Sequence, residues 1–169
     1  AERKQALSTL CEKVRAGEII LPEPDTDVNL HCHTFFSYNS YGYSPSKFAW
    51  LARKAGLAVA GVVDFDVLDA LEEFLDAAKI LNLKACAGLE TRVFVPEFSE
   101  RVINSPGEPG ISYHMGVGFP SATLESEQEK FLLGLRKTAQ KRNRDLTKRV
   151  NKNLRPTELD YEQDVLVLT

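Results

Sequence analysis

Apolar residues recur at intervals of three and four along four segments of the chain, which is the spacing of an amphipathic helix. The clearest stripe runs from Leu68 to Leu81, and Asp66 precedes it as a candidate helix cap. Ser44 and Pro45 are residue types that open a helix, a side-chain cap followed by proline at the first helical position. The pattern therefore predicts helices over residues 2–16, 45–55, 67–82 and 124–154.

Short apolar runs between these helices are typical of strands. Residues 57–64 are almost continuously apolar, which indicates a strand buried on both faces. We expect further strands over residues 27–33, 84–95 and 111–119, and the start of another in the final apolar run, residues 165–169. Strands that alternate with helices predict right-handed crossovers and an α/β fold with about four parallel strands.

Three regions follow from this order of elements. Residues 1–26 hold an N-terminal helix and a linker, residues 27–119 form a βα core, and residues 120–169 hold a long basic helix and the beginning of a further strand. The segment 96–110 contains three prolines and two glycines, and its length is typical of a functional loop or lid. Because the chain starts at Ala1 and stops within an apolar run, we expect a fragment of a longer protein.

Composition narrows the class of protein. Apolar residues make up 43% of the 169 residues, which is enough for a core, and no apolar run reaches the length of a membrane span. The three cysteines form no Cys-x-x-Cys pair, which favours reduced thiols and a cytoplasmic location. The net charge of −3 hides a basic segment, because residues 136–155 hold nine basic residues and one acid. That segment is either a solvated helix face or a contact for nucleic acid or polyphosphate.

The chemistry is concentrated near the ends of the predicted strands. His31 and His33 are two residues apart at the end of the first strand, so both imidazoles lie on one face and can reach a shared cation. Asp64 ends the second strand, Glu90 lies in the third and His114 lies in the fourth. Ligands gather at the carboxyl ends of parallel strands, so this pattern favours a metal site.

Each candidate residue also has an alternative interpretation in which it takes no direct part in the chemistry. Asp64 either takes part directly in the chemistry or orients a histidine, and Asp66 is a candidate cap of the following helix. His114 is either a ligand or a core histidine. Arg92 lies two residues beyond Glu90 and on the same face, where it either binds a phosphate or stays at the surface.

Taken together, these residues resemble the PHP (polymerase and histidinol phosphatase) family over about residues 27–119. The motifs that carry the resemblance are His31-x-His33, Ser44-Pro45, Gly56-Leu57, Asp64-Phe65-Asp66, Gly88-Leu89-Glu90 and His114. The resemblance implies a distorted (βα)7 barrel, here present in part, with metal ions at its mouth and hydrolysis of phosphoesters. It implies His31, His33, Glu90 and His114 as metal ligands, with Glu90 bridging two ions. From their positions in the sequence we expect Asp64 as the catalytic carboxylate and Arg92 as the substrate contact.

Two departures from the family pattern reduce the expected site. Phe65 stands where the family usually has a metal-binding histidine, and the loop 37–42 has no carboxylate where the family usually has Ser-Asp-Gly. Both departures fall on the same part of the family's site. We therefore expect one or two divalent ions, which the mixed ligand set allows to be zinc, manganese or iron.

Three functions are compatible with this sequence. The first is a metal-dependent phosphoesterase with a reduced metal site, acting on a phosphorylated small molecule or a nucleotide. The second is a non-catalytic PHP-like module whose basic segment contacts nucleic acid or a partner domain. The third is a structural half-barrel that associates with itself or with a missing half.

Overall fold

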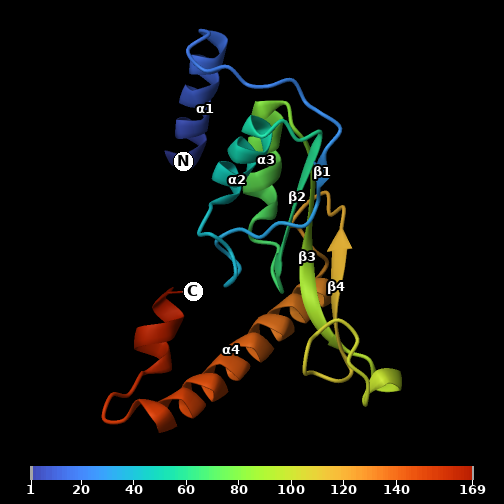
Figure 1. Cartoon of the computed structure of the whole chain (residues 1–169), viewed down its shortest axis with the longest axis vertical. Coiled ribbons are helices and arrows are strands. Elements are labelled where there is room, and N and C mark those ends of the chain that lie inside the picture. The colour runs from blue at the N-terminus through green and yellow to red at the C-terminus, as the bar shows by residue number, and fades with distance from the viewer. Residues whose placement is uncertain (1, 169) are drawn as a thin grey trace. The chain divides into compact units, whose positions relative to one another are not determined.

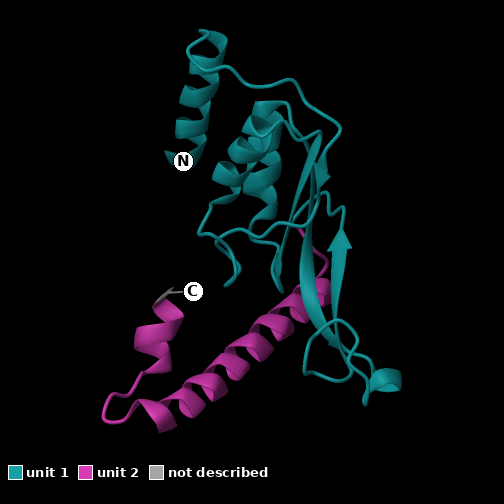
Figure 2. Ribbon diagram, viewed as in Figure 1, with its two compact units in different colours: residues 1–122 teal, residues 123–169 magenta. Residues whose placement is uncertain are grey.

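A computed structural model describes residues 2–168 of the chain. The chain divides into two compact units, residues 1–122 and residues 123–169 (Figure 2). The first unit contains the sheet, three helices and every candidate site residue. The second unit contains the whole basic segment, residues 136–155.

The first unit is built on a four-stranded sheet with the strand order β1-β2-β3-β4 (Figure 1). The strands are β1 (Val28–Asn29), β2 (Val59–Phe65), β3 (Lys84–Phe94) and β4 (Ile111–Val117). The first three strands pair in parallel, as predicted. The first strand is much shorter than the predicted range, so His31 and His33 lie just beyond its end.

The prediction that the fourth strand is also parallel is wrong. β4 runs antiparallel to β3, with Glu90 opposite Met115 and Thr91 opposite His114. The reason lies in the connection. A parallel crossover needs a long connection, usually a helix, whereas residues 95–110 contain only the short 3₁₀ turn Pro96–Phe98 and return the chain to the same edge of β3. The apolar pattern did not reveal the direction of β4, because side chains alternate between the two faces of the sheet in parallel and antiparallel strands alike.

Three helices accompany the sheet: α1 (Glu2–Arg15), α2 (Pro45–Lys54) and α3 (Leu71–Leu81) (Figure 1). α2 begins as predicted, because the Ser44 side chain accepts a hydrogen bond from the Lys47 N–H. The core consists of buried side chains from α3 and the two central strands, including Phe74, Leu71, Val62 and Val63.

The prediction that Asp66 caps α3 is wrong. The helix begins five residues later, at Leu71, and its N-terminal cap, Ala70, makes no side-chain hydrogen bond. Asp66 instead directly follows β2 and has a left-handed conformation, with a φ of 59°. Its carboxylate accepts a hydrogen bond of 2.6 Å from the Thr91 hydroxyl of β3.

The second unit consists of α4 (Ser126–Leu154) followed by two short helical turns, Tyr161–Val165 and Leu166–Leu168. Arg144 of α4 donates two hydrogen bonds to Glu162, and Asn151 donates to and accepts from the backbone of Leu159. The prediction of a strand over residues 165–169 is wrong for residues 165–168, because these residues are helical. Thr169 lies outside the described residues. Among the described helices, none combines the length and the apolar character needed to cross a membrane.

Candidate metal centre

The two histidines are held in place by a close approach between the backbone of residues 30–33 and the backbone of β2. The segment that carries them continues alongside β2, where the Val63 N–H donates to the Cys32 carbonyl at 2.9 Å. Gly61 permits this approach, because a Cβ atom there would lie 2.8 Å from the Cα of Leu30. The absence of a side chain at Gly61 thus lets the segment pass close to the sheet with both imidazoles beside β3.

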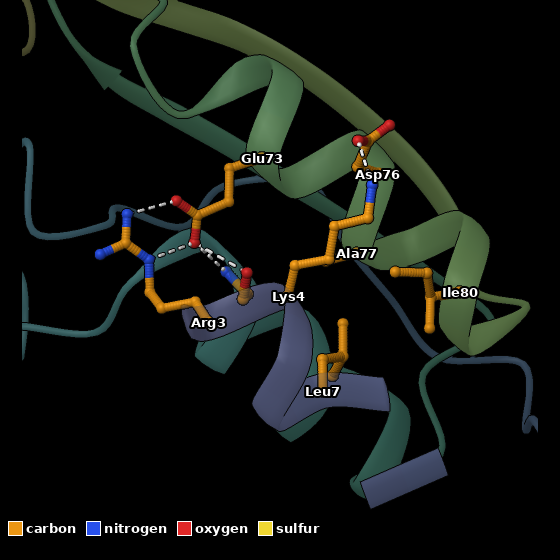
Figure 3. A pocket seen from close by; sticks show the side chains of 8 residues that line it. Arg3, Lys4, Leu7, Glu73, Asp76, Ala77 and Ile80 are labelled. Carbon is orange, nitrogen blue, oxygen red and sulfur yellow. Dashed lines mark hydrogen bonds and ion pairs between the residues drawn. The ribbon is translucent and has the colours of Figure 1, made fainter. Parts of the chain in front are cut away.

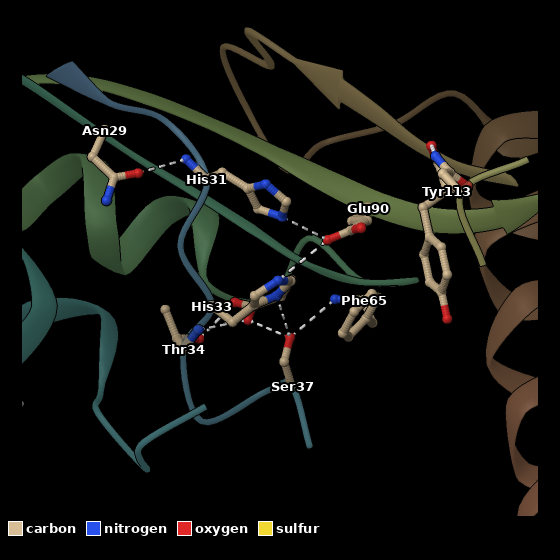
Figure 4. A network of polar contacts seen from close by, with 10 residues as sticks. Asn29, His31, His33, Thr34, Ser37, Phe65, Glu90 and Tyr113 are labelled. Carbon is tan, nitrogen blue, oxygen red and sulfur yellow. Dashed lines mark hydrogen bonds and ion pairs between the residues drawn. The ribbon is translucent and has the colours of Figure 1, made fainter. Parts of the chain in front are cut away.

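The imidazoles of His31 and His33 converge on the carboxylate of Glu90 (Figure 4). The Nε2 atom of His31 lies 3.0 Å from Glu90 Oε2, and the Nε2 atom of His33 lies 3.2 Å from the same oxygen. One ligand atom from each of the three residues fits within a group in which all atoms lie within 4.8 Å of one another. Among the described residues, this is the group of three or more such side chains that could hold a metal ion.

This donor set fits a divalent cation. Burying a carboxylate is costly unless it is paired, and the Glu90 side chain is only 8% exposed. Two imidazoles and one carboxylate are a ligand set found at zinc and non-haem iron sites, and three protein ligands leave positions open for water or substrate. The arrangement can therefore hold one ion with an accessible face.

A buried hydrogen-bond network supports His33 from the other side. Asp64, 1% exposed, accepts hydrogen bonds from the Thr34 N–H at 2.7 Å, the Thr34 hydroxyl at 2.5 Å and the Ser37 hydroxyl at 2.6 Å. Ser37 Oγ also accepts from the Phe65 N–H at 3.0 Å and lies 3.2 Å from His33 Nδ1. The structure therefore places Asp64 behind Ser37 and not among the three ligands. That position suits an orienting carboxylate, and a direct catalytic role for Asp64 stays a prediction.

Burial favours the neutral form of His33. The pKa of this imidazole is lowered from its usual value chiefly by burial, which outweighs the opposite influence of the Glu90 and Asp64 carboxylates, while His31 lowers it further. The neutral ring is the form that binds metal. The local environment thus prepares His33 for ligation near neutral pH.

Phe65 packs against the centre instead of contributing a ligand. Its ring stacks on His33, with centroids 4.6 Å apart and planes 21° apart, and on Tyr38, with centroids 5.3 Å apart. Phe65 is aligned with Glu90 in the register of β2 and β3, so the two side chains share a face of the sheet. Where the resemblance would place a histidine, this chain has an aromatic wall.

The structure does not bring His114 together with the other three predicted ligands. His114 is opposite Thr91 in the antiparallel pair, whereas Glu90 is opposite Met115. Directly opposed residues share a face and neighbours along a strand alternate, so His114 lies on the face away from Glu90. Its side chain is exposed.

Arg92 does lie on the Glu90 face, as predicted, but it is engaged elsewhere. Its guanidinium donates to Glu108 at 2.5 Å and lies over the Tyr113 ring. Its Nε atom is buried and has no hydrogen-bond acceptor within the described part of the chain. Binding of substrate by Arg92 stays a prediction, as does a contact between the basic segment of α4 and nucleic acid.

A small pocket of about 240 Å³ lies away from this centre, where α1, α2 and α3 meet (Figure 3). The residues that line it are Arg3, Lys4, Leu7, Ser46, Glu73, Asp76, Ala77 and Ile80. Its polar groups bind one another: Glu73 accepts from Arg3 and from Ser46. We interpret this pocket as a helix junction.

The sequence indicated that His31, His33 and Glu90 lie together, but it gave no sign of the hydrogen-bond network behind them. Ser37 and Thr34 are small hydroxyl residues in an irregular segment, and the pattern gives no sign that both are buried against Asp64. The one usable signal was the position of Asp64 at a strand end, which raised the alternative of an orienting carboxylate.

No family model and no curated protein matches the chain in sequence. Among solved structures, an amidohydrolase from Chromobacterium violaceum, with bound sulfate and no metal, is similar with a TM-score of 0.61 and 17% identity over 81% of this chain and 42% of that one. The likeness is one of fold. A protein from Bifidobacterium adolescentis, provisionally assigned as a metal-dependent phosphoesterase, matches with 29% identity and a TM-score of 0.37 over 42% of this chain.

The chain spans only 42% and 24% of the lengths of these two proteins. The α/β sheet with its flanking helices therefore corresponds to part of a larger fold in the amidohydrolase structure.

Proposed function

We propose that the chain is the metal-binding part of a metal-dependent hydrolase that cleaves phosphate esters. The observation that carries the proposal is the convergence of His31, His33 and Glu90, from two separate segments, on one point beside the parallel strands. The sequence resemblance to the PHP family supports the choice of phosphoesters.

The three residues provide ligands for a single ion. In this proposal Phe65 and the outward position of His114 account for the reduced site. When bound, a divalent ion supplies an activated water and charge stabilisation for phosphoryl oxygens. His31 and His33 hold their Nε2 atoms toward that position, and Phe65 excludes water from one side of the His33 ring.

Arg92 is our candidate for the residue that contacts the phosphate. It follows Glu90 by two residues and shares its face, and a guanidinium can bind a phosphate through two parallel hydrogen bonds. Its ion pair with Glu108 would have to exchange for the substrate, which makes Glu108 a competitor for the same guanidinium.

An assay of phosphomonoester hydrolysis tests this function. The metal-free chain is supplied in turn with zinc, manganese and iron(II), and release of p-nitrophenol from p-nitrophenyl phosphate is followed. We expect metal-stimulated hydrolysis that falls to the background rate in His31→Ala and His33→Ala, because each substitution removes a ligand. His114→Ala is the matched control and should retain the rate.

Two results would contradict the proposal. Saturable metal binding without any stimulation of phosphoester hydrolysis would remove the assigned reaction. Stimulation that persists in both His31→Ala and His33→Ala would remove the assigned site.

A further inference from the structure

We propose that Ser37 is a positioning residue that holds the proton of neutral His33 on Nδ1, so that the Nε2 lone pair faces the candidate metal centre. The role of this tautomer in metal binding rests on the proposed function. The tautomer itself is a property of the metal-free chain and can be measured without any metal.

The hydrogens around Ser37 Oγ lead to this assignment. A serine hydroxyl has one hydrogen to donate and two lone pairs to accept with. Three groups surround the oxygen: Asp64 Oδ1 at 2.6 Å, the Phe65 nitrogen at 3.0 Å and His33 Nδ1 at 3.2 Å. The Phe65 N–H can only donate, so it uses one lone pair.

The single hydroxyl hydrogen of Ser37 goes to Asp64. The two oxygens of that carboxylate already accept from the N–H and the hydroxyl of Thr34. The Thr34 hydroxyl in turn accepts from the Phe36 N–H at 3.4 Å, so its own hydrogen is free to point at Asp64. Every partner of Asp64 is therefore a donor, and the 2.6 Å contact with Ser37 is a donation to the carboxylate.

One lone pair of Ser37 then remains for His33. The contact with Nδ1 is a hydrogen bond only if Nδ1 carries the hydrogen. On the other side of the ring, Nε2 lies 3.2 Å from Glu90 Oε2, and in the absence of metal that carboxylate attracts a hydrogen to Nε2. Ser37 and Glu90 thus favour opposite tautomers (Figure 4).

The outcome of this competition decides whether the ligand atom is free. Ser37 is 4% exposed and fixed by two further hydrogen bonds, so it cannot turn away from His33 without leaving buried groups unpaired. Hydrogen bonds from the second nitrogen of a metal-binding histidine fix its tautomer and orientation in known metal sites. We assign that function to Ser37.

Nitrogen NMR of the metal-free chain tests the inference directly. Histidine is labelled with ¹⁵N, and long-range ¹⁵N–¹H correlations are recorded at about pH 8, where an ordinary imidazole is neutral. The chain contains three histidines, and single replacements of His31 and His114 assign the signals. We expect His33 with its proton on Nδ1, and a shift toward the Nε2-protonated form in Ser37→Ala.

Thr34→Val is the matched control. It removes another hydroxyl donor from the same Asp64 carboxylate and keeps the backbone N–H, but it removes no contact with His33. The tautomer of His33 should therefore stay unchanged in Thr34→Val. Ser37→Thr keeps the hydroxyl and should preserve the Nδ1 form.

Several outcomes would overturn the inference. A proton on Nε2 of His33 in the unmodified chain does so without any variant, which covers the case in which Ser37→Ala fails to fold. An unchanged tautomer in Ser37→Ala, or an equal shift in Thr34→Val, also overturns it, because the effect would then not belong to the Ser37–His33 contact.

A zinc titration separates this inference from the proposed function. If both hold, Ser37→Ala lowers the affinity for zinc about 10- to 100-fold, the usual effect of removing such a supporting contact, and Thr34→Val lowers it much less. If the unmodified chain binds none of zinc, manganese and iron(II) but shows the Nδ1 tautomer, the proposed function fails and the role of Ser37 stands. If zinc binds equally well to Ser37→Ala, the positioning role fails.

Discussion

The imidazole of His33 is held at both of its nitrogens and on one of its faces. Glu90 lies at Nε2, Ser37 lies at Nδ1, and the Phe65 ring stacks on the plane of the imidazole. Each contact comes from a different part of the chain, and together they leave the ring little freedom. At the scale of single residues, the geometry of the candidate centre depends more on His33 than on the half-exposed His31.

The lowered pKa of His33 predicts how stability depends on pH. In the folded chain the ring protonates at a lower pH than its ordinary value of 6.5, chiefly because burial disfavours the charge. Just below that value the unfolded chain binds more protons than the folded one, so the free energy of unfolding falls as the pH drops through this window. Above pH 6.5 the contribution is fully present.

Urea unfolding of the metal-free chain at several values between about pH 8 and pH 5 measures this effect. His33→Asn should remove part of the loss at low pH, whereas His114→Asn, a replacement at an exposed position, should leave the pH dependence as it is. Equal pH dependence in the unmodified chain and in His33→Asn would show that the ring titrates alike in both states.

The sequence was sufficient to group His31, His33 and Glu90, because each is a polar residue at the end of, or within, a predicted apolar strand. Parallel strands bring such positions together. The same reasoning grouped His114 with them, and the structure separates it. A motif records the order of residues along the chain, but the face on which a side chain lies also depends on strand direction and pairing.

At the scale of elements, three helices are joined through one carboxylate. Glu73 of α3 accepts two hydrogen bonds from Arg3 of α1, and it accepts from both the N–H and the hydroxyl of Ser46 in the first turn of α2. Although burial acts to raise the pKa of Glu73, the contacts with Arg3 and Ser46 outweigh it and lower the pKa. The carboxylate thus satisfies a free N–H at the start of α2 as well as linking the helices.

Removing this carboxylate should destabilise the first unit. We expect Glu73→Ala to lower the free energy of unfolding by about 2 kcal/mol, because the N–H and hydroxyl of the buried Ser46 lose their acceptor. Asp76→Ala is the control, since Asp76 only pairs with Lys4 at 3.4 Å and both side chains are more than half exposed. Chemical denaturation followed by circular dichroism measures both; equal losses would contradict a special role for Glu73.

Helices and central strands could be predicted because their apolar spacing is long and regular, as for β2 and α3. The direction of β4 could not, since it depends on how a loop of irregular structure returns to the sheet. The strand predicted over 165–169 illustrates a second limit. A short apolar run does not show whether its spacing is that of a strand or of a helix. In the described residues this run forms helical turns.

At the scale of the whole first unit, the sheet has two different faces. The face that carries Glu90 and Phe65 also carries Met115 and Val117, which are 51% and 54% exposed. The candidate centre therefore lies on a face that is partly open in the described residues. Its position beside the ends of β1 and β2 agrees with the general location of ligand sites in α/β folds.

We propose that His31, His33 and Glu90 form one site for a divalent ion. Calorimetric titration of the metal-free chain with zinc, repeated with manganese, tests this most directly. We expect saturable binding of about one ion per chain, since the described residues contain one such group of candidate ligands. Binding should be abolished in His33→Ala and in Glu90→Gln and retained in His114→Ala. Absence of saturable binding, or binding lost in His114→Ala but intact in His33→Ala, would contradict it.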